Sequence, residues 1–328
     1  MDPDGHRDVS PADQARLLGH LGISQPGDWE TDWRRSGVID ATAACWPDAA
    51  TSDWLWSLGL PLLSEVRRHL NERRLIGLSA LPGCGKTSLG HWLEAAATHL
   101  GLALQVVSID DFYFEAEELE RSMAGNPWGV PRALPGSHDL ELLNSTLADW
   151  KAGNPVELPR FDKALRGGRG DRCGWRPCSA DVLILEGWFI GVTPEPDDLQ
   201  LSEADDSVVP PLNSLECKAR VGIQDVLGSY RSTWQQLDSL WQLRPQRWDS
   251  PELWKRQQEQ QMMQSRGICL SQADLDGFIR MIAAAIPRES FNAIDADICI
   301  DVDPERRLGK LRIQAQDQDS LSSDSATG

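Results

Sequence analysis

Apolar and polar residues follow two periods along most of this chain, one typical of strands and one typical of helices. Short apolar runs predict β-strands at residues 75–79, 103–109, 182–186, 238–243 and 297–302. Apolar residues spaced three to four positions apart predict helices at 86–100, 139–151, 219–231, 251–265 and 272–286. Strands that alternate with helices favour a mostly parallel sheet. We therefore predict an α/β fold with three layers, α/β/α.

Other parts of the chain lack this alternation. Residues 1–70 contain amphipathic stretches at 12–21 and 54–70, which predict a helical extension. Residues 193–216 are rich in proline and acidic residues, which is typical of a surface loop. The Ser/Asp/Gln-rich end of the chain predicts a disordered tail. The expected organisation is a helical extension (1–70), a central domain (71–312) and a tail (313–328).

The loop after the first predicted strand carries the clearest chemical signal. Residues 80–87 read Ala-Leu-Pro-Gly-Cys-Gly-Lys-Thr, and a predicted helix begins at the end of this run. Backbone N–H groups of such a loop, together with the positive end of the helix dipole, bind phosphate. We predict that the nucleotide contacts Gly83, Cys84, Gly85, Lys86, Thr87 and Ser88, with Lys86 on the outer phosphates and the Thr87 hydroxyl on Mg²⁺. The alternative is a plain glycine-rich turn.

This loop departs from the usual phosphate-loop pattern at one position. The pattern has glycine five residues before Gly85, and Ala80 stands there. Because alanine does not tolerate a positive φ, we expect Ala80 to have an ordinary backbone conformation.

Carboxylates follow two of the predicted strands. Asp110 and Asp111 come directly after the second strand, and Glu186 ends the third. Ligands of parallel sheets gather at the carboxyl ends of the strands, where these side chains would meet. They could accept a proton from a substrate hydroxyl or hold Mg²⁺. The alternatives are a helix N-cap for one aspartate and a charged strand end at the solvent boundary for Glu186.

Positive charges are concentrated in residues 160–176, named here the basic segment. It holds Arg160, Lys163, Arg166, Arg169, Arg172 and Arg176 against Asp162 and Asp171. Its four glycines predict a mobile loop. Grouped arginines suit a compact anion because a guanidinium binds a carboxylate or phosphate in bidentate fashion. The alternative is a solvated loop that pairs with acids elsewhere.

Two further segments could contribute to a site. In Gly136-Ser137-His138-Asp139, either Ser137 or Asp139 caps the next helix, and His138 either faces a pocket or does not. In the predicted helix at 251–265, Lys255 or Arg256 could close over the phosphates. A solvated helix face explains these two cations equally well.

Composition limits the partners and the setting of the protein. The 328 residues carry a net charge of −18, which opposes general binding to nucleic acid or anionic membranes. Seven cysteines, an odd number, favour a reduced cytoplasmic protein over a disulfide framework. We expect neither a targeting leader nor a membrane span. Because Cys84 lies inside the phosphate loop, its oxidation could block nucleotide binding.

Six segments, taken in order, resemble the plant-type D-glycerate 3-kinases, relatives of uridine kinase and pantothenate kinase among the P-loop kinases. The segments are 76–87, 108–113, 136–140, 158–163, 168–172 and 185–188. The resemblance implies a P-loop NTPase fold that uses ATP and Mg²⁺. It also implies catalysis by Lys86, Asp110 and Glu186, and a metal site at Thr87, Asp110 and Glu186. Residues 254–259 resemble the family's Trp-Arg-x-Gln-Gln-Glu helix, with Lys255 in place of the usual arginine.

The resemblance implies phosphorylation of D-glycerate to 3-phosphoglycerate, a small-molecule reaction that serves photorespiratory glycerate salvage. We predict substrate contacts from Asp111, Tyr113, His138, Arg160, Lys163, Arg169 and Arg172. The alternatives are a P-loop kinase for a nucleoside or pantothenate, a regulatory nucleotide-binding protein without turnover, and an ATPase that binds nucleic acid.

Overall fold

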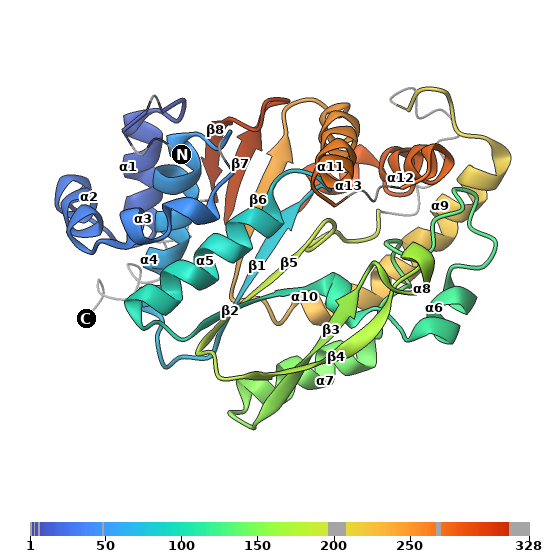
Figure 1. The fold of residues 1–328 in the computed structure, drawn as a ribbon, viewed down its shortest axis with the longest axis horizontal. Coiled ribbons are helices and arrows are strands. Elements are labelled where there is room, and N and C mark those ends of the chain that lie inside the picture. The colour runs from blue at the N-terminus through green and yellow to red at the C-terminus, as the bar shows by residue number, and fades with distance from the viewer. Residues whose placement is uncertain are drawn as a thin grey trace, which may run out of the picture.

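The central sheet has six strands, with helices on both faces (Figure 1). The computed structural model describes residues 2, 4–5, 7–47, 49–195, 208–266 and 270–314. The strand order is β2-β5-β1-β6-β7-β8, and all neighbours are parallel except β7 and β8. The strands are β1 Arg74–Ala80, β2 Leu104–Ser108, β5 Val182–Gly187, β6 Ser239–Pro245, β7 Ile298–Val302 and β8 Leu308–Ile313. The α/β prediction and its five strands are confirmed; β8 was not predicted.

The strand register brings the predicted loops to one edge of the sheet. Glu186 of β5 lies opposite Leu78 of β1 on one side and Ser108 of β2 on the other. Leu243 of β6 lies opposite Ala80. Because these strands are parallel, the loops that follow β1, β2, β5 and β6 all leave at this edge.

The five predicted helices are present. They are α5 Lys86–Leu100, α7 Leu140–Lys151, α9 Ser214–Leu227, α11 Ser250–Arg266 and α12 Gln272–Ala284. Helix α9 begins five residues before its predicted start because Asn213 and Glu216 form a capping box there. Shorter elements also occur: η3 Ile109–Phe112, α6 Ala116–Ser122, α8 Leu165–Gly168, η4 Gly228–Tyr230, α10 Arg231–Trp234 and α13 Arg288–Asn292.

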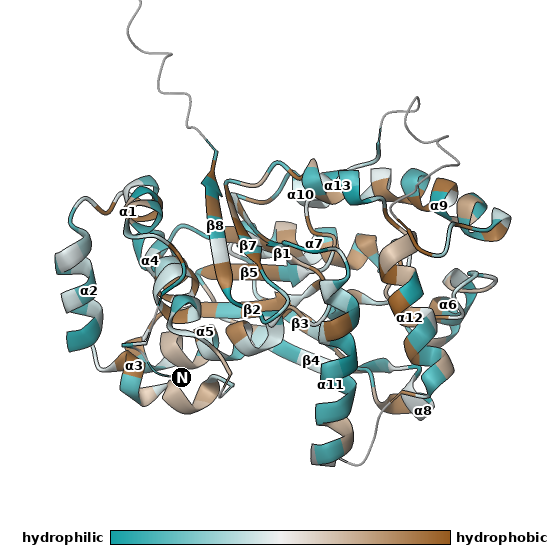
Figure 2. Cartoon of the chain, turned by 90° about the horizontal axis from the view of Figure 1, so that it is seen from above, coloured by the Kyte–Doolittle hydropathy of each residue, from teal (hydrophilic) through white to brown (hydrophobic). Residues whose placement is uncertain are grey.

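The N-terminal region is helical, as predicted, and shares a core with the sheet. Its elements are α1 Pro11–His20, α2 Pro26–Arg35, α3 Val38–Ala41, η1 Ala43–Cys45, η2 Trp54–Gly59 and α4 Leu60–Arg68. One apolar cluster joins Leu17 and Trp56 from these helices to Ile76 of β1 and Leu89 of α5. Figure 2 shows apolar residues along the central strands and hydrophilic residues over α2 and α11. The helices of residues 11–68 therefore pack as part of the main body.

The basic segment is not a mobile loop, so that prediction was wrong. It lies in an antiparallel hairpin of β3 Val156–Asp162 and β4 Asp171–Cys178, joined through α8. Leu158 and Pro159 are buried, whereas the charged residues on either side of them point outward. The hairpin forms because backbone hydrogen bonds between the two strands compensate for the glycines and the repulsion of the cations.

The predicted loop at 193–216 is described only in part. Residues 196–207 lie outside the described residues, and 214–216 belong to α9. The predicted tail begins at 313, but Ile313 is the last residue of β8; residues 315–328 lie outside the described residues.

Candidate active site

The loop between β1 and α5 has the shape of a phosphate cradle. Gly83 and Gly85 adopt φ values of +80° and +123°, a region that favours glycine. A Cβ atom on Gly83 would also lie 2.7 Å from Cβ of Trp254. Ala80 is the last residue of β1, so its backbone is extended as expected. Only glycine therefore fits at positions 83 and 85.

Lys86 and Thr87 open helix α5 beside this loop. The Lys86 ammonium donates to the carbonyl oxygens of Ala80, at 2.5 Å, and Leu81, at 3.4 Å. Thr87 is exposed. No side chain caps the first turn of α5, whose N-cap is Gly85. The helix start thus presents its backbone N–H groups and positive dipole end to an anion.

Cys84 lies within the loop, and its side chain is buried, with 1% of the residue exposed. Burial raises the pKa of its thiol to about 11, although Lys86 and Arg306 oppose this shift. Because the thiolate is the reactive form, this environment argues against the hypothesis of redox control at Cys84.

Asp110 lies in η3 and meets three side chains of the site. Its Oδ2 is 2.5 Å from Nζ of Lys163, and its Oδ1 accepts a 2.6 Å hydrogen bond from the Tyr113 hydroxyl. Nε2 of His138 lies 3.8 Å from the same Oδ1. Burial alone would raise the pKa of Asp110, but Lys163 and His138 outweigh it and hold this pKa well below its usual value. Asp110 is therefore ionised near neutral pH.

The other two carboxylates differ from Asp110. Burial raises the pKa of Glu186, and Lys86 opposes this shift. Burial also raises the pKa of Asp111, whose Oδ1 accepts a 3.1 Å hydrogen bond from the backbone N–H of Phe161 in β3. Asp111 thus anchors the hairpin, and its predicted contact with substrate stays a prediction.

His138 is buried, and a residue that the sequence did not reveal, Tyr230, fixes its protonation. The His138 ring stacks on Tyr113 with centroids 4.6 Å apart. The Tyr230 hydroxyl accepts from the N–H of Gly136 at 2.9 Å and lies 2.8 Å from Nδ1 of His138. Burial raises the pKa of Tyr230 and lowers that of His138, so the phenol keeps its proton and the imidazole is neutral.

This arrangement makes Nε2 of His138 a hydrogen-bond donor. Because the Tyr230 oxygen already accepts from Gly136 N–H, we assign the phenol proton to the bond with Nδ1, which places the ring proton on Nε2. Among the described residues, the buried Nε2 has no hydrogen-bond partner. Its N–H points toward Asp110 and is available to an incoming acceptor. The cap of the next helix is Asp139, which accepts from the N–H of Leu142; Ser137 instead donates to Leu134 O.

Most arginines of the basic segment are already paired with acids. Arg166 and Arg169 both bind Glu120 of α6, at 2.6 and 3.0 Å. Arg176 binds Glu94 of α5 at 3.2 Å. Arg160 is exposed. For Arg166, Arg169 and Arg176 the structure matches the alternative of a segment paired elsewhere, and the substrate roles of Arg160 and Arg169 stay predictions.

Lys163 and Arg172 are the basic-segment cations that contact Asp110 and Tyr113. Lys163 contacts Asp110 directly. Arg172 donates to Tyr113 O and to Glu115, both at 3.1 Å, and its side chain is 11% exposed. The hairpin therefore brings two positive charges to the side of Tyr113 and Asp110.

Lys255 and Arg256 of helix α11 lie in different surroundings. Nζ of Lys255 lies 2.7 Å from Glu259 and over the Phe278 ring. Burial lowers the pKa of Lys255 despite Glu259, and the charge of Lys163 lowers it further. Arg256 pairs with acids on the surface, Glu252 and Asp276.

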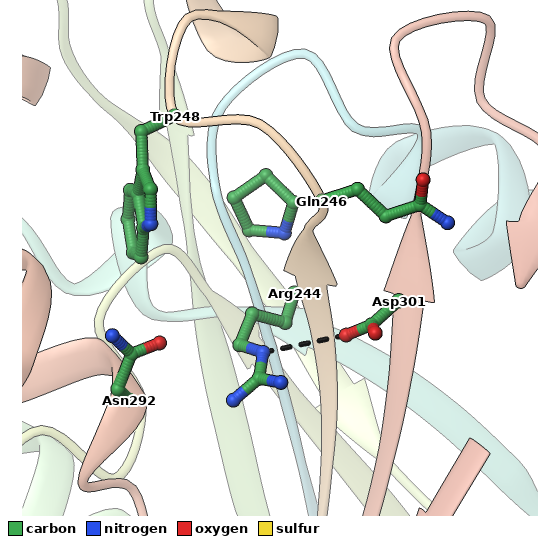
Figure 3. A pocket seen from close by; sticks show the side chains of 6 residues that line it. Arg244, Gln246, Trp248, Asn292 and Asp301 are labelled. Atoms are coloured by element: carbon green, nitrogen blue, oxygen red, sulfur yellow. Dashed lines mark hydrogen bonds and ion pairs between the residues drawn. The ribbon is translucent and has the colours of Figure 1, made fainter. Parts of the chain in front are cut away.

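A separate hollow of about 440 Å³ lies at the carboxyl ends of β6 and β7. Figure 3 shows its lining, in which Nε of Arg244 lies 3.3 Å from Asp301. The lining residues are Arg244, Pro245, Gln246, Trp248, Asn292 and Asp301. None of the predicted site residues belongs to this lining.

A phosphate loop with ionised carboxylate and lysines at the same sheet edge defines the protein as an α/β P-loop kinase. None of the searched family models matches the chain. It is 31% identical over 196 residues to the uncharacterized kinase mug58 of Schizosaccharomyces pombe, covering 56% of this chain and 69% of that protein. The chain belongs to this family of P-loop kinases, whose members include D-glycerate 3-kinases.

Two D-glycerate 3-kinases are similar to the chain. The chloroplastic enzyme of Arabidopsis thaliana is 36% identical over 137 residues, which are 38% of this chain and 30% of the plant protein. The solved enzyme of Cryptococcus neoformans superposes with a TM-score of 0.65 at 26% identity and covers 79% of this chain and 97% of its own. The similarity to the plant enzyme thus spans less than a third of that protein.

Among the residues that the structure describes, no helix has both the length and the apolar character needed to cross a bilayer.

Proposed function

We propose that the protein transfers the γ-phosphoryl group of ATP to D-glycerate and releases 3-phosphoglycerate. The observation that carries the proposal is the ionised Asp110 carboxylate. It lies between Lys163, Tyr113 and His138 at the sheet edge from which the phosphate loop leaves. The similarity to two D-glycerate 3-kinases supports this substrate.

Lys86 and Asp110 have complementary roles in this proposal. The Lys86 ammonium, now bound to loop carbonyls, moves to the β- and γ-phosphates of ATP. Asp110 orients the acceptor hydroxyl and receives its proton as the phosphoryl group moves. Because its pKa is held low, Asp110 contributes chiefly by orientation, and positioning and electrostatics account for most of the rate.

Three groups beside Asp110 suit a small carboxylate. Lys163 and Arg172 supply positive charge, and Nε2 of His138 supplies a buried N–H donor. A charged acceptor shortens and strengthens such hydrogen bonds. A neutral nucleoside has no carboxylate for these three groups to bind.

The residues that would hold Mg²⁺ are Thr87, Glu186 and Asp110, which supply one hydroxyl and two carboxylates. The described residues contain no cluster of three or more His, Cys, Asp or Glu side chains that could hold a metal alone. At kinase sites one or two carboxylates bind Mg²⁺ together with waters and substrate phosphates. When bound, Mg²⁺ would neutralise charge on the transferring phosphates.

A coupled ATPase assay with D-glycerate, uridine and pantothenate in parallel tests the proposal. We expect turnover with D-glycerate alone, and a product identified by mass spectrometry as 3-phosphoglycerate. The Lys86→Met variant is the control for contaminating kinases and should lack turnover. Phosphorylation of uridine or pantothenate instead would refute the substrate, and ATP binding without any product would indicate a regulatory protein.

The cytoplasmic location and the photorespiratory role belong to the same proposal. Fractionation of the source cells tests the first. Accumulation of glycerate in a deletion strain under conditions that produce glycolate tests the second.

A further inference from the structure

Arg306, in the turn between β7 and β8, contacts the phosphate loop with its side chain. Its Nε donates a 2.8 Å hydrogen bond to the carbonyl oxygen of Gly83. Its other two nitrogens bind helix α11, with Nη1 at 2.7 Å from Gln257 Oε1 and Nη2 at 3.3 Å from Trp254 O. One guanidinium therefore joins the phosphate loop to the helix that carries Lys255.

Trp54, in the N-terminal region, supports the same loop from a second direction. Its Nε1 donates a 2.6 Å hydrogen bond to the backbone oxygen of Arg306. A Cβ atom on Gly85 would lie 3.0 Å from Cη2 of Trp54, so the indole ring lies against the loop backbone. The ring is 4% exposed and packs on Trp46, which stacks on Trp92 of α5.

The backbone of Arg306 is suited to both contacts. Its φ of +62° is in the left-handed region, which residues other than glycine rarely adopt. The turn is held by hydrogen bonds from Arg306 N to Asp303 O and from Asp303 N to Arg307 O. In this conformation the carbonyl of Arg306 reaches Trp54 while its side chain reaches Gly83.

We propose that Arg306 and Trp54 are positioning residues, which keep the phosphate loop in its nucleotide-binding shape. The N-terminal region then contributes to the nucleotide site through Trp54. A loop that samples other shapes binds more weakly, by the fraction of time it spends in the competent one. The inference rests on the phosphate site of the proposed function, and not on the identity of the phosphoryl acceptor.

Loss of Arg306 should therefore affect the nucleotide more than the acceptor. Loss of a hydrogen bond from a charged donor weakens an equilibrium constant by about tenfold to a hundredfold. We expect the Arg306→Gln variant to bind ADP with Mg²⁺ about tenfold or more weakly in calorimetry. Its KM for ATP should rise in proportion, and its KM for D-glycerate should stay within about twofold of the parent value.

Neighbouring variants separate positioning from folding. Arg306→Lys keeps the charge and should recover part of the ADP affinity. Trp54→Phe keeps the ring and removes the donor, so it should weaken ADP binding less than Arg306→Gln. The matched control is Arg307→Gln, because Arg307 pairs on the surface with Asp303 and does not contact the loop. It should bind ADP as the parent does.

Two results would overturn the inference. One is ADP binding by Arg306→Gln that equals the parent's. The other is an equal loss of affinity for ADP and D-glycerate together with a lower melting temperature, which indicates a merely structural role. If the unaltered protein binds ADP but does not phosphorylate D-glycerate, the proposed substrate fails while the calorimetry still tests Arg306. If it does not bind ADP, both proposals fail.

Discussion

Replacing Tyr230 by phenylalanine removes one oxygen atom on which the buried His138 ring and the half-buried N–H of Gly136 depend. The hydroxyl accepts from the N–H of Gly136 and lies 2.8 Å from Nδ1 of His138, to which we assign its proton. In Tyr230→Phe both partners lose that hydrogen bond while the ring packing remains. A buried polar group without a partner costs about 1–3 kcal/mol, and the half-buried N–H of Gly136 costs less, so we expect the free energy of unfolding to fall by about 2–4 kcal/mol.

The same substitution should weaken substrate binding specifically. Without the Tyr230 hydroxyl, Nδ1 of His138 keeps only the 3.5 Å contact with Oγ of Ser137, and a larger share of the rings carries its proton on Nδ1. Part of the hydrogen bond that Nε2 of His138 would donate to the substrate is then lost. We expect the KM for D-glycerate to rise about fivefold to tenfold, which is part of the value of a hydrogen bond to a charged group. ADP binding should not change.

Steady-state kinetics, ADP calorimetry and urea unfolding of one preparation measure these three effects. Tyr113→Phe is the natural comparison, because Tyr113 and Tyr230 are the two tyrosines of the chain. Tyr113 donates to Asp110, so its loss should lower kcat more than it raises the KM for D-glycerate. If Tyr230→Phe keeps the parent's KM and stability, the tautomer argument is wrong.

Three other substitutions test separate parts of the structure. Asp110→Asn should lower kcat about 10²- to 10⁴-fold with ADP binding retained. Steady-state kinetics and ADP calorimetry measure the two quantities, and a smaller fall in kcat would contradict the role of Asp110. Glu216→Gln breaks the buried pair with Arg280, at 2.7 Å, and should lower the free energy of unfolding by about 3 kcal/mol in urea titrations. Arg280 lowers the pKa of Glu216, so the pair stabilises the fold above the ordinary glutamate pKa of 4.5 and loses this effect as pH falls through the lowered value. The difference between parent and variant should therefore vanish in acid, and a difference that persists there would contradict the assignment. Lys255→Met should lower kcat more than Arg256→Gln does, and equal effects would show that Lys255 has no special role.

The strongest sequence predictions concerned segments that are local in the chain. The apolar run of β1, the glycine-rich loop and the start of α5 all lie between Arg74 and Lys86, and each part has its own pattern. The hairpin of the basic segment was missed because its charges and glycines are atypical of strands. Two sets of hydrogen bonds stabilise the hairpin: those between β3 and β4, and the one that the N–H of Phe161 donates to Asp111.

Sequence alone therefore determined the parallel sheet, the phosphate loop and the carboxylates at the strand ends. The tertiary structure decided which side chains meet there. Tyr230 reaches His138 across 92 positions, Arg306 reaches Gly83 across 223, and Trp54 reaches Arg306 across 252. No local pattern encodes such distant contacts. They depend on how the N-terminal helices, the hairpin and the β7–β8 turn pack around one sheet edge, and packing of that kind is a property of the whole chain.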